Sequence, residues 1–225
     1  MPRDLLLLHG AGLGAWIWDR VLPHLLLPAL ALDLPGRGDG TPPGDVTIEQ
    51  SVELVTRHIG DDTVIVGHSF GAMIALAAAA TRKRASVIAV GGVTPESGKT
   101  FLSIIPFPQR LFLGVMLRRA KNGIAIPPSL VRKGYCNDLD RETTELVLRQ
   151  LTPEAPRLYL DPVEWSPHAP AYVKLLLDQS AAPKEQDRMI QRMHATRVET
   201  LRTGHLPMLA QPQETAAVLN RLSGQ

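Results

Sequence analysis

Cysteine is almost absent from this chain of 225 residues, in which Cys136 is the only one. A disulfide within the chain is therefore excluded, and so is a metal site built from several cysteines. So little cysteine suits a reducing compartment. We expect a cytoplasmic protein that binds no metal ion and uses no cofactor.

Long hydrophobic runs are also missing. The run Leu5–Leu8 is too short for the apolar part of a signal peptide, and the other runs are too short to span a membrane. Charge of one sign does not accumulate, because 24 basic side chains are balanced by 22 acidic ones and the net charge is +2. The densest basic cluster, 82–84, closes a predicted helix, where cations interact favourably with the helix dipole. We therefore expect neither a nucleic acid nor a membrane as a partner.

The most informative stretch that is present runs from Thr63 to Ala80 and reads TVIVGHSFGAMIALAAAA. A short β-branched run passes through Gly67-His68-Ser69-Phe70-Gly71 into an alanine-rich helix. This order predicts a nucleophile elbow, a tight turn between strand and helix that lifts the Ser69 hydroxyl clear of the sheet. Glycine on each side removes Cβ atoms that would obstruct the turn. The motif G-x-S-x-G alone is weak, so the prediction depends on the strand before it and the helix after it.

Short apolar runs alternate with helix-like stretches, which predicts a doubly wound α/β fold with a mostly parallel sheet of about six strands. The expected strands are 5–8, 29–32, 63–66, 86–90, 172–177 and 198–201. The expected helices are 15–26, 48–59, 71–81, 184–194 and 214–222. Such a sheet has its ligand site at the carboxyl ends of the strands. The proline-rich block 95–167 shows helical fragments and no clear strand. We expect a helical cap there, inserted into a core made of 1–94 and 168–225.

A serine hydroxyl is a poor nucleophile at neutral pH, so Ser69 needs a base. His205 is the best candidate, because it follows the last predicted strand and a loop there can carry an imidazole to the elbow. His9 is expected to shape the turn before Gly10, and His68 to point to the opposite side of the elbow. The other histidines are expected on helix or cap surfaces: His24, His58, His168 and His194.

Asp178 is the best candidate for the carboxylate that orients this base. It ends the penultimate predicted strand, and the resulting chain order Ser, Asp, His is the one that an elbow of this kind uses. Asp187 lies in a polar predicted helix and is more consistent with a surface charge. Asp33 and Asp138 are weaker alternatives for the acid.

Attack on an acyl group also requires hydrogen-bond donors for the oxyanion that develops. The first candidate is the backbone N–H of Phe70, directly after the nucleophile at the start of a helix. The second is the N–H of Ala11, because the glycine-rich stretch 9–14 at the exit of the first strand can swing toward the elbow. The same glycines do not fit the spacing G-x-G-x-x-G, which makes nucleotide binding a poor alternative.

Together these motifs resemble the α/β-hydrolases, and within them the plant methylesterase and hydroxynitrile lyase group with its bacterial esterase relatives. The resemblance rests on HGAG followed by AWIW at 9–18, DLPGRG at 33–38, the elbow, Asp178 and GHLPM at 204–208. It implies a triad of Ser69, Asp178 and His205, and an oxyanion hole formed by Ala11 and Phe70. This fold normally has eight strands, so two leading strands are expected to be absent here, which leaves six and a more exposed sheet edge.

The resemblance also separates two chemistries. Hydroxynitrile lyases of this group have a lysine directly after the catalytic histidine and a threonine in the oxyanion loop, whereas this chain has Leu206 and Gly10 at those places. An isobutyl group cannot stabilise departing cyanide as an ammonium does. Hydrolysis of a carboxylic ester is therefore the expected activity, through an acyl-enzyme intermediate.

The sequence indicates the substrate less specifically than the catalytic residues. A small or medium neutral ester is expected, including a lactone or an aryl ester, and Gly10, Leu206, Phe112 and Met116 are expected to line its pocket. Other apolar residues that could wall the pocket are Phe101, Phe107, Leu111, Leu113 and Val115, whereas Trp16 and Trp18 are expected to brace the oxyanion loop. A lactonase, thioesterase, perhydrolase or carbon–carbon hydrolase on the same triad remains open, as does a small-molecule receptor without turnover.

Overall fold

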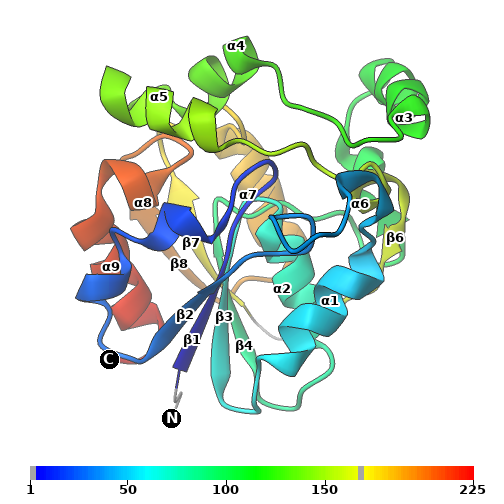
Figure 1. Ribbon diagram of the computed structural model, residues 1–225. Helices are drawn as coiled ribbons and strands as arrows, with labels where there is room; N and C mark the ends of the chain where they lie inside the picture. The colour runs from blue at the N-terminus through cyan, green and yellow to red at the C-terminus, as the bar shows by residue number, and fades with distance from the viewer. Residues whose placement is uncertain (1–3, 167–169) are drawn as a thin grey trace.

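The structure is a computed structural model that describes residues 4–166 and 170–225. Its centre is a six-stranded sheet with the order β2-β1-β3-β4-β7-β8, in which every pairing is parallel (Figure 1). The strands are β1 (Asp4–Leu8), β2 (Ala29–Leu32), β3 (Thr63–His68), β4 (Ser86–Val90), β7 (Ala171–Leu175) and β8 (Arg197–Leu201). The predicted fold class is therefore confirmed.

The central strands are apolar on both faces because both faces are covered. In β1, Leu6 and Leu8 belong to one buried cluster, whereas Leu5 and Leu7 belong to a second cluster on the other face. All six residues of β3 are buried. The side-chain period of two thus divides one short apolar run between two cores.

Helices cover each face of the sheet (Figure 1). On one side lie α1 (Ile48–Arg57), α2 (Gly71–Ala79) and α7 (Pro183–Arg192), and on the other α8 (Pro207–Ala210) and α9 (Pro212–Leu222). The helix α2 is buried along its whole length, which its alanines permit because small side chains let it lie close to the sheet. Thr47 begins α1 with a capping box, since its side chain and that of Gln50 each accept the other's backbone N–H.

The helix expected over 15–26 does not form. The chain instead makes two short 3₁₀ turns, η1 (Ala15–Trp18) and η2 (Leu22–His24). Pro23 lies in the middle of this stretch and cannot donate the hydrogen bond that a continuous α-helix would need. Trp18 is fully buried in the second cluster.

Residues 91–166 connect β4 to the approach of β7 and pass over the carboxyl ends of the strands (Figure 1). Their helices are η4 (Phe101–Ile104), α3 (Gln109–Arg119), α4 (Pro128–Leu130), the π-helix η5 (Val131–Tyr135), α5 (Arg141–Gln150) and α6 (Arg157–Leu160). The expectation that this block contains no strand is wrong, because β5 (Lys99–Thr100) and β6 (Pro162–Val163) form a short antiparallel pair. The expected cap boundary after 167, and His168, lie outside the described residues.

Within the two described ranges, no helix combines the length and the apolar character needed to cross a membrane.

Candidate active site

Ser69 lies directly after β3 in a backbone conformation that few side chains tolerate. Its φ is +50°, and its N–H donates to the carbonyl of Val90 at 2.9 Å. A Cβ on Gly67 would lie 2.5 Å from the Cα of Ala72, and one on Gly71 would collide with the carbonyl oxygen of His9. Both glycines are therefore required by the close approach of neighbouring backbone, as the tight-turn argument predicted.

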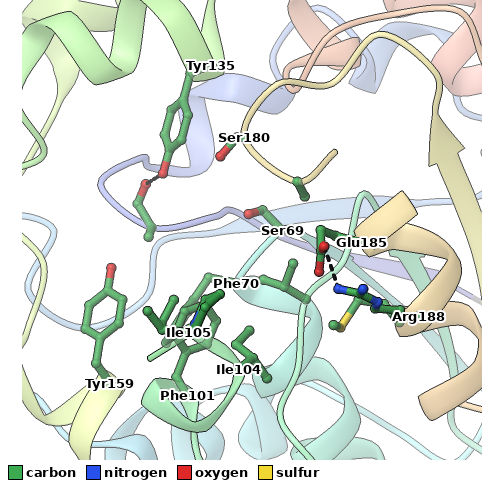
Figure 2. A pocket seen from close by; sticks show the side chains of 15 residues that line it. Ser69, Phe70, Phe101, Ile104, Ile105, Tyr135, Tyr159, Ser180, Glu185 and Arg188 are labelled. Carbon is green, nitrogen blue, oxygen red and sulfur yellow. Dashed lines mark hydrogen bonds and ion pairs between the residues drawn. The ribbon is translucent and has the colours of Figure 1, made fainter. Parts of the chain in front are cut away.

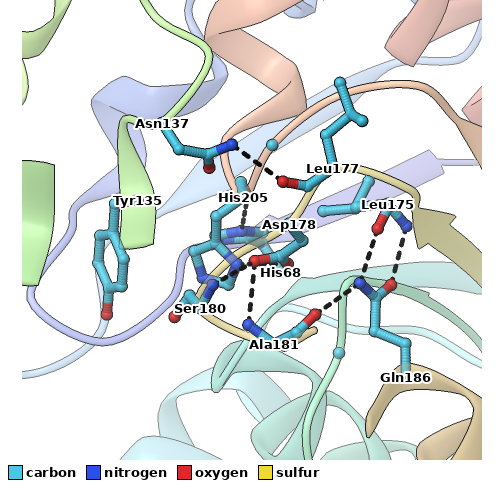
Figure 3. Close-up of polar contacts among 12 residues, drawn as sticks. His68, Tyr135, Asn137, Leu175, Leu177, Asp178, Ser180, Ala181, Gln186 and His205 are labelled. Atoms are coloured by element: carbon cyan, nitrogen blue, oxygen red, sulfur yellow. Dashed lines mark hydrogen bonds and ion pairs between the residues drawn. The ribbon is translucent and has the colours of Figure 1, made fainter. Parts of the chain in front are cut away.

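His205 and Asp178 lie in contact at the carboxyl ends of β8 and β7. Nδ1 of His205 lies 2.8 Å from Oδ2 of Asp178, and both side chains are buried (Figure 3). The other carboxylate oxygen accepts N–H bonds from Ser180 at 2.7 Å and Ala181 at 2.9 Å, which fixes the orientation of the carboxylate. Nε2 of His205 is buried without a hydrogen-bond partner among the described residues. A neutral ring that donates from Nδ1 to Asp178 therefore has its lone pair on Nε2, where a general base needs it.

His68 was expected to point to the opposite side of the elbow, but it lies against His205. Its Nε2 lies 2.8 Å from the carbonyl oxygen of His205, and the two rings are 4.8 Å apart. The cause is the strand period, since His68 follows Val66 by two residues and shares its face of the sheet, on which Leu206 also packs. Burial lowers the pKa of His68 well below its usual value, so its ring is neutral and donates to that carbonyl.

His9 ties the first loop to the second strand's exit. Its Nδ1 lies 2.9 Å from the carbonyl oxygen of Gly10, and its Nε2 accepts the N–H of Leu34 at 3.1 Å. Burial is the main reason why the pKa of His9 falls to about 3, with the nearby Arg37 as the second cause. The ring is thus a neutral structural bridge beneath the turn that carries Ala11.

A cavity of about 500 Å³ opens beside Ser69 and the two expected oxyanion residues, Ala11 and Phe70. Figure 2 shows Phe70, Phe101 and Ile105 on one side of Ser69, with Tyr135 and Ser180 on the other. The remaining lining residues are Val93, Ile104, Pro106, Tyr159, Ala181, Glu185, Arg188 and Met189. Aromatic rings form much of one wall, since Phe70, Phe101 and Tyr159 have their ring centres 5.1–5.5 Å apart.

The family follows from comparison with known proteins. The model of the "Alpha/beta hydrolase family" matches residues 5–218 of this chain. The chain belongs to the alpha/beta hydrolase family. This confirms the resemblance drawn from the motifs.

Among solved structures, this hydrolase is similar to an extracellular alpha/beta-hydrolase from a Paenibacillus species, with a TM-score of 0.86, 18% identity and 100% coverage of both chains. It is also similar to polyneuridine aldehyde esterase, with a TM-score of 0.80 and 21% identity over 99% of this chain and 100% of the other. At such identities the likeness shows the fold.

Among curated proteins, the hydrolase is 40% identical over 75 residues to a pimeloyl-[acyl-carrier protein] methyl ester esterase from Aromatoleum aromaticum. That match covers 32% of this chain and 30% of the relative. The chain thus aligns with less than a third of the length of this curated relative.

A buried ion pair holds the loop that carries Ala11 to the connection between β4 and β7, whose described residues, 91–166, are called the inserted segment from here on. Arg37 and Glu154 lie 2.6 Å apart, and both side chains are at most 5% exposed. Glu154 also accepts the N–H of Gly12 at 2.9 Å, and Arg37 donates to the carbonyl of Leu13 at 2.6 Å. No sequence motif indicated this pair, because its two members are 117 positions apart.

Four residues were assigned to the substrate pocket from sequence, and three of them are elsewhere. Phe112 and Met116 lie on the outer face of α3, 71% and 43% exposed, while Leu206 is buried in the core beneath the histidine loop. Gly10 is adjacent to the site, since a Cβ there would approach both Ser69 and His68 to 3.0 Å. Neither residue of α3 lines the cavity, because that helix buries Gly114 and Leu117 and exposes Phe112 and Met116.

The other apolar candidates differ among themselves. Phe107, Leu111 and Val115 are exposed, whereas Phe101 lines the cavity. The polar and charged lining residues that sequence reasoning missed are Tyr135, Tyr159, Ser180, Glu185 and Arg188. Only Ser180 carried a usable signal, because it follows the candidate acid by two positions.

The alternative acids have other partners. Asp187 pairs with Lys174 on the surface. Asp33 accepts the N–H of Ala15 at 2.6 Å, and Asp138 accepts the N–H of Gly204 at 2.5 Å. Each carboxylate therefore has a structural contact that does not involve Nδ1 of His205.

Histidine, cysteine and carboxylate side chains nowhere gather in groups of three or more that could hold a metal ion, as far as residues 4–166 and 170–225 are concerned.

Proposed function

We propose that this protein is a serine hydrolase that cleaves a small or medium neutral carboxylic ester through Ser69, His205 and Asp178. The observation that carries the proposal is the buried pair of His205 and Asp178, in which Nδ1 faces the carboxylate and Nε2 has no partner among the described residues. Nε2 can therefore act as the base. Ser69, the nucleophile, lies on a strained elbow at the cavity. Family membership supports the same chemistry.

In the proposed reaction, His205 removes the proton of the Ser69 hydroxyl through Nε2 as the hydroxyl oxygen attacks the ester carbonyl. The imidazolium then returns that proton to the leaving alcohol, and an acyl-enzyme remains. Water, activated by the same nitrogen, releases the acid and restores the serine. Asp178 holds the ring through Nδ1, and the N–H bonds of Ser180 and Ala181 keep its carboxylate in place.

The N–H groups of Ala11 and Phe70 are the proposed donors to the oxyanion. Both residues line the cavity beside Ser69, and Phe70 begins the approach to α2, whose dipole favours negative charge. One donor of this kind typically lowers the barrier by ~3 kcal/mol.

A neutral substrate suits the lining of the cavity, which is mainly apolar and aromatic. The two charged side chains in the wall form an ion pair, with Nη1 of Arg188 2.7 Å from Oε1 of Glu185, so the wall has no net charge from them. The curated relatives are named as methyl ester esterases, which agrees with a small alcohol as the leaving group. Residues 95–167 form the proposed cap, and 1–94 with 168–225 the proposed catalytic core.

The decisive test is titration with a p-nitrophenyl organophosphonate, which reacts with an activated serine. We expect release of one p-nitrophenolate per chain and modification of Ser69, whereas the folded Ser69→Ala variant releases none. Hydrolysis of p-nitrophenyl acetate, butyrate and octanoate then measures turnover and pocket length together. A folded wild-type chain that is not modified would contradict the proposal and favour a receptor without turnover. Turnover confined to lactones or thioesters would reassign the bond that is cleaved.

A further inference from the structure

Three residues of the stretch Tyr135 to Asp138 in the inserted segment form hydrogen bonds to three of the loops that make up the proposed site. The hydroxyl of Tyr135 donates to the carbonyl of Ala11 at 3.2 Å. The amide of Asn137 donates to the carbonyl of Leu177 at 2.9 Å, as Figure 3 shows. Asp138 accepts the N–H of Gly204 at 2.5 Å. The three loops come from distant parts of the sequence, and this segment bonds to each of them.

Each contact falls on or next to a residue with a proposed chemical role. The Leu177 carbonyl belongs to the peptide group that joins Leu177 to Asp178, so its hydrogen bond fixes the plane from which the carboxylate projects. Gly204 directly precedes His205, and its bound N–H fixes the turn that presents the imidazole. The contacts therefore act on backbone groups whose rotation would move the reacting side chains.

Tyr135 adds a contact with the imidazole itself. Its ring centre lies 4.8 Å from that of His205, with an angle of 37° between the planes, while His68 lies at the same distance with an angle of 56°. The imidazole thus has an aromatic neighbour from the inserted segment and another from β3. Rotation of the His205 ring away from Asp178 would require one of these neighbours to move.

The segment is itself firmly anchored at both ends. Tyr135 is the last residue of η5, and the Cys136 N–H donates to the carbonyl of Val131 at 3.0 Å to close that π-helix. On the other side, Asp140 begins α5 and accepts the N–H of Thr143 at 2.7 Å. Cys136 is buried between the two, and this burial raises the pKa of its thiol to about 11. A segment fixed in this way can impose its geometry on the loops that it contacts.

The loop before the histidine is shaped to receive this segment. A Cβ on Gly204 would collide with the carboxylate of Asp138 and would lie 2.6 Å from Oδ1 of Asn137. By contrast, a Cβ on Gly134 would meet only ordinary contacts, at 3.6 Å or more from Ser180. The glycine at 204 is therefore required by the approach of the Asn137–Asp138 pair.

We infer that Tyr135, Asn137 and Asp138 are positioning residues for the proposed triad and oxyanion loop. Through them the inserted segment sets the geometry of catalysis as well as walling the cavity. The inference rests on the proposed function, because it assigns these residues an effect on the reactivity of Ser69. They do not take part in proton transfer, and loss of their hydrogen bonds should lower kcat and leave KM for a small ester almost unchanged.

The first test separates a hydrogen-bond acceptor at 138 from an acid. Asp138→Ala should lower kcat for p-nitrophenyl acetate by about 10- to 100-fold, as expected when reacting groups are displaced by a fraction of an ångström to one ångström. Asp138→Asn keeps an oxygen acceptor for the Gly204 N–H and should retain kcat within about threefold of wild type. Asp140→Asn, two residues further along, keeps the acceptor for the Thr143 N–H at the start of α5. It is the matched control, and its kcat should be unchanged.

The second test measures the hydrogen bond between His205 and Asp178 directly, which a change in overall stability alone would not alter. In proton NMR, the Nδ1–H of His205 hydrogen-bonded to Asp178 gives a downfield resonance, which is assigned by its loss in His205→Gln. We expect it to shift or broaden in the double variant Asn137→Ala/Asp138→Ala and in Tyr135→Phe, with thermal unfolding measured in parallel. Tyr135→Phe keeps the ring and removes only the hydrogen bond to Ala11, so it is expected to fold.

Three outcomes would overturn the inference. The first is an unchanged kcat and an unchanged His205 resonance in the folded double variant. The second is a loss of kcat in Asp138→Asn as large as that in Asp178→Asn. The third is that the variants change only the temperature of thermal unfolding. Failure of the proposed function looks different. In that case wild-type Ser69 is not modified by the organophosphonate, while the NMR comparison still reports whether the segment positions His205.

Discussion

The sheet core and the inserted segment use their apolar side chains in opposite ways. In β1 and β3 nearly every apolar residue is buried, and the alternation along the strand decides which face it joins. In the inserted segment, Phe107 and Phe112 are more than 70% exposed, whereas Tyr159, a more polar residue, lines the cavity. Hydropathy therefore locates the core well but not the walls of a site.

The two regions also divide the proposed work. Ser69, Asp178 and His205 all lie on loops that follow strands of the sheet, at its carboxyl edge. The inserted segment supplies much of the cavity wall and two sets of contacts to the loops, one through Glu154 and one through Tyr135–Asp138. In the proposed function, the core thus carries the reacting groups, and the inserted segment holds the loops on which they lie. The following predictions test this division, beginning with the largest effect.

Asp178→Asn should abolish most of the activity without unfolding the protein. The Asn side chain can still accept the N–H bonds of Ser180 and Ala181 through its oxygen, so its amide NH₂ then faces Nδ1 of His205. This stabilises the wrong tautomer, and kcat is expected to fall by about 10⁴-fold. Steady-state kinetics with circular dichroism measures both effects. Asp187→Asn is the control and should change kcat little. Full activity in Asp178→Asn, with loss in Asp33→Asn, would move the acid to the other loop.

Glu154→Ala should destabilise the fold more than any exposed charge change in the inserted segment. It leaves the buried guanidinium of Arg37 unpaired and the N–H of Gly12 without its acceptor, and such losses typically cost about 3–5 kcal/mol. Urea unfolding gives this free energy. The control is Glu145→Ala, whose pair with Arg132 is 40–49% exposed and should cost less than about 1 kcal/mol. Equal costs for both would show that the buried pair does not join insertion to core.

Acidification should weaken the core through two buried histidines. The pKa of His9 is lowered to about 3 and that of His68 lies well below its usual value, whereas both groups titrate near 6.5 in the unfolded chain. The unfolded state therefore binds more protons as the pH falls below 6.5. Stability is complete above that pH and is lost toward pH 3, by up to about 1.4 kcal/mol per pH unit for each histidine.

Urea midpoints between pH 7.5 and pH 4.5 measure this slope. His9→Gln should have a shallower slope than wild type, and His58→Gln, which changes an exposed residue, should leave the slope as it is. A slope that does not respond to His9→Gln would mean that other groups control acid stability.

The smallest effect is expected on the outer face of α3. Phe112→Ser should change the free energy of unfolding by less than about 0.5 kcal/mol, because the side chain is already 71% exposed. It should also leave kcat/KM for p-nitrophenyl hexanoate within about twofold. Phe101→Ala, which removes a ring from the cavity wall, should raise KM for the same ester. Equal effects of the two variants would contradict the assignment of the wall.

The local parts of the site could be predicted because local sequence controls them. The elbow depends on Gly67 and Gly71, each two positions from Ser69, and on the β-branched residues before them. These constraints act within about ten residues. Even here the structure corrected one detail, because His68 was assigned to the wrong side although the strand period places it with Val66. The expected helix over 15–26 does not form for another local reason, because Pro23 has no backbone N–H to donate.

The cavity wall could not be predicted in the same way. Whether Phe112 or Phe101 faces the cavity depends on how η4 and α3 pack against α6, not on either residue's own hydropathy. The contacts of Glu154, Asn137 and Asp138 join positions 40 to 142 residues apart. No local pattern records such distances.

The sequence by itself determined the parallel sheet, the elbow at Ser69 and the candidates His205 and Asp178, because side-chain period and glycine sterics act between near neighbours. Only the tertiary structure decided which aromatic rings face the cavity and which segment holds the three loops. Those choices depend on packing and hydrogen bonds between distant residues, whose energies exist only once the chain has brought them together.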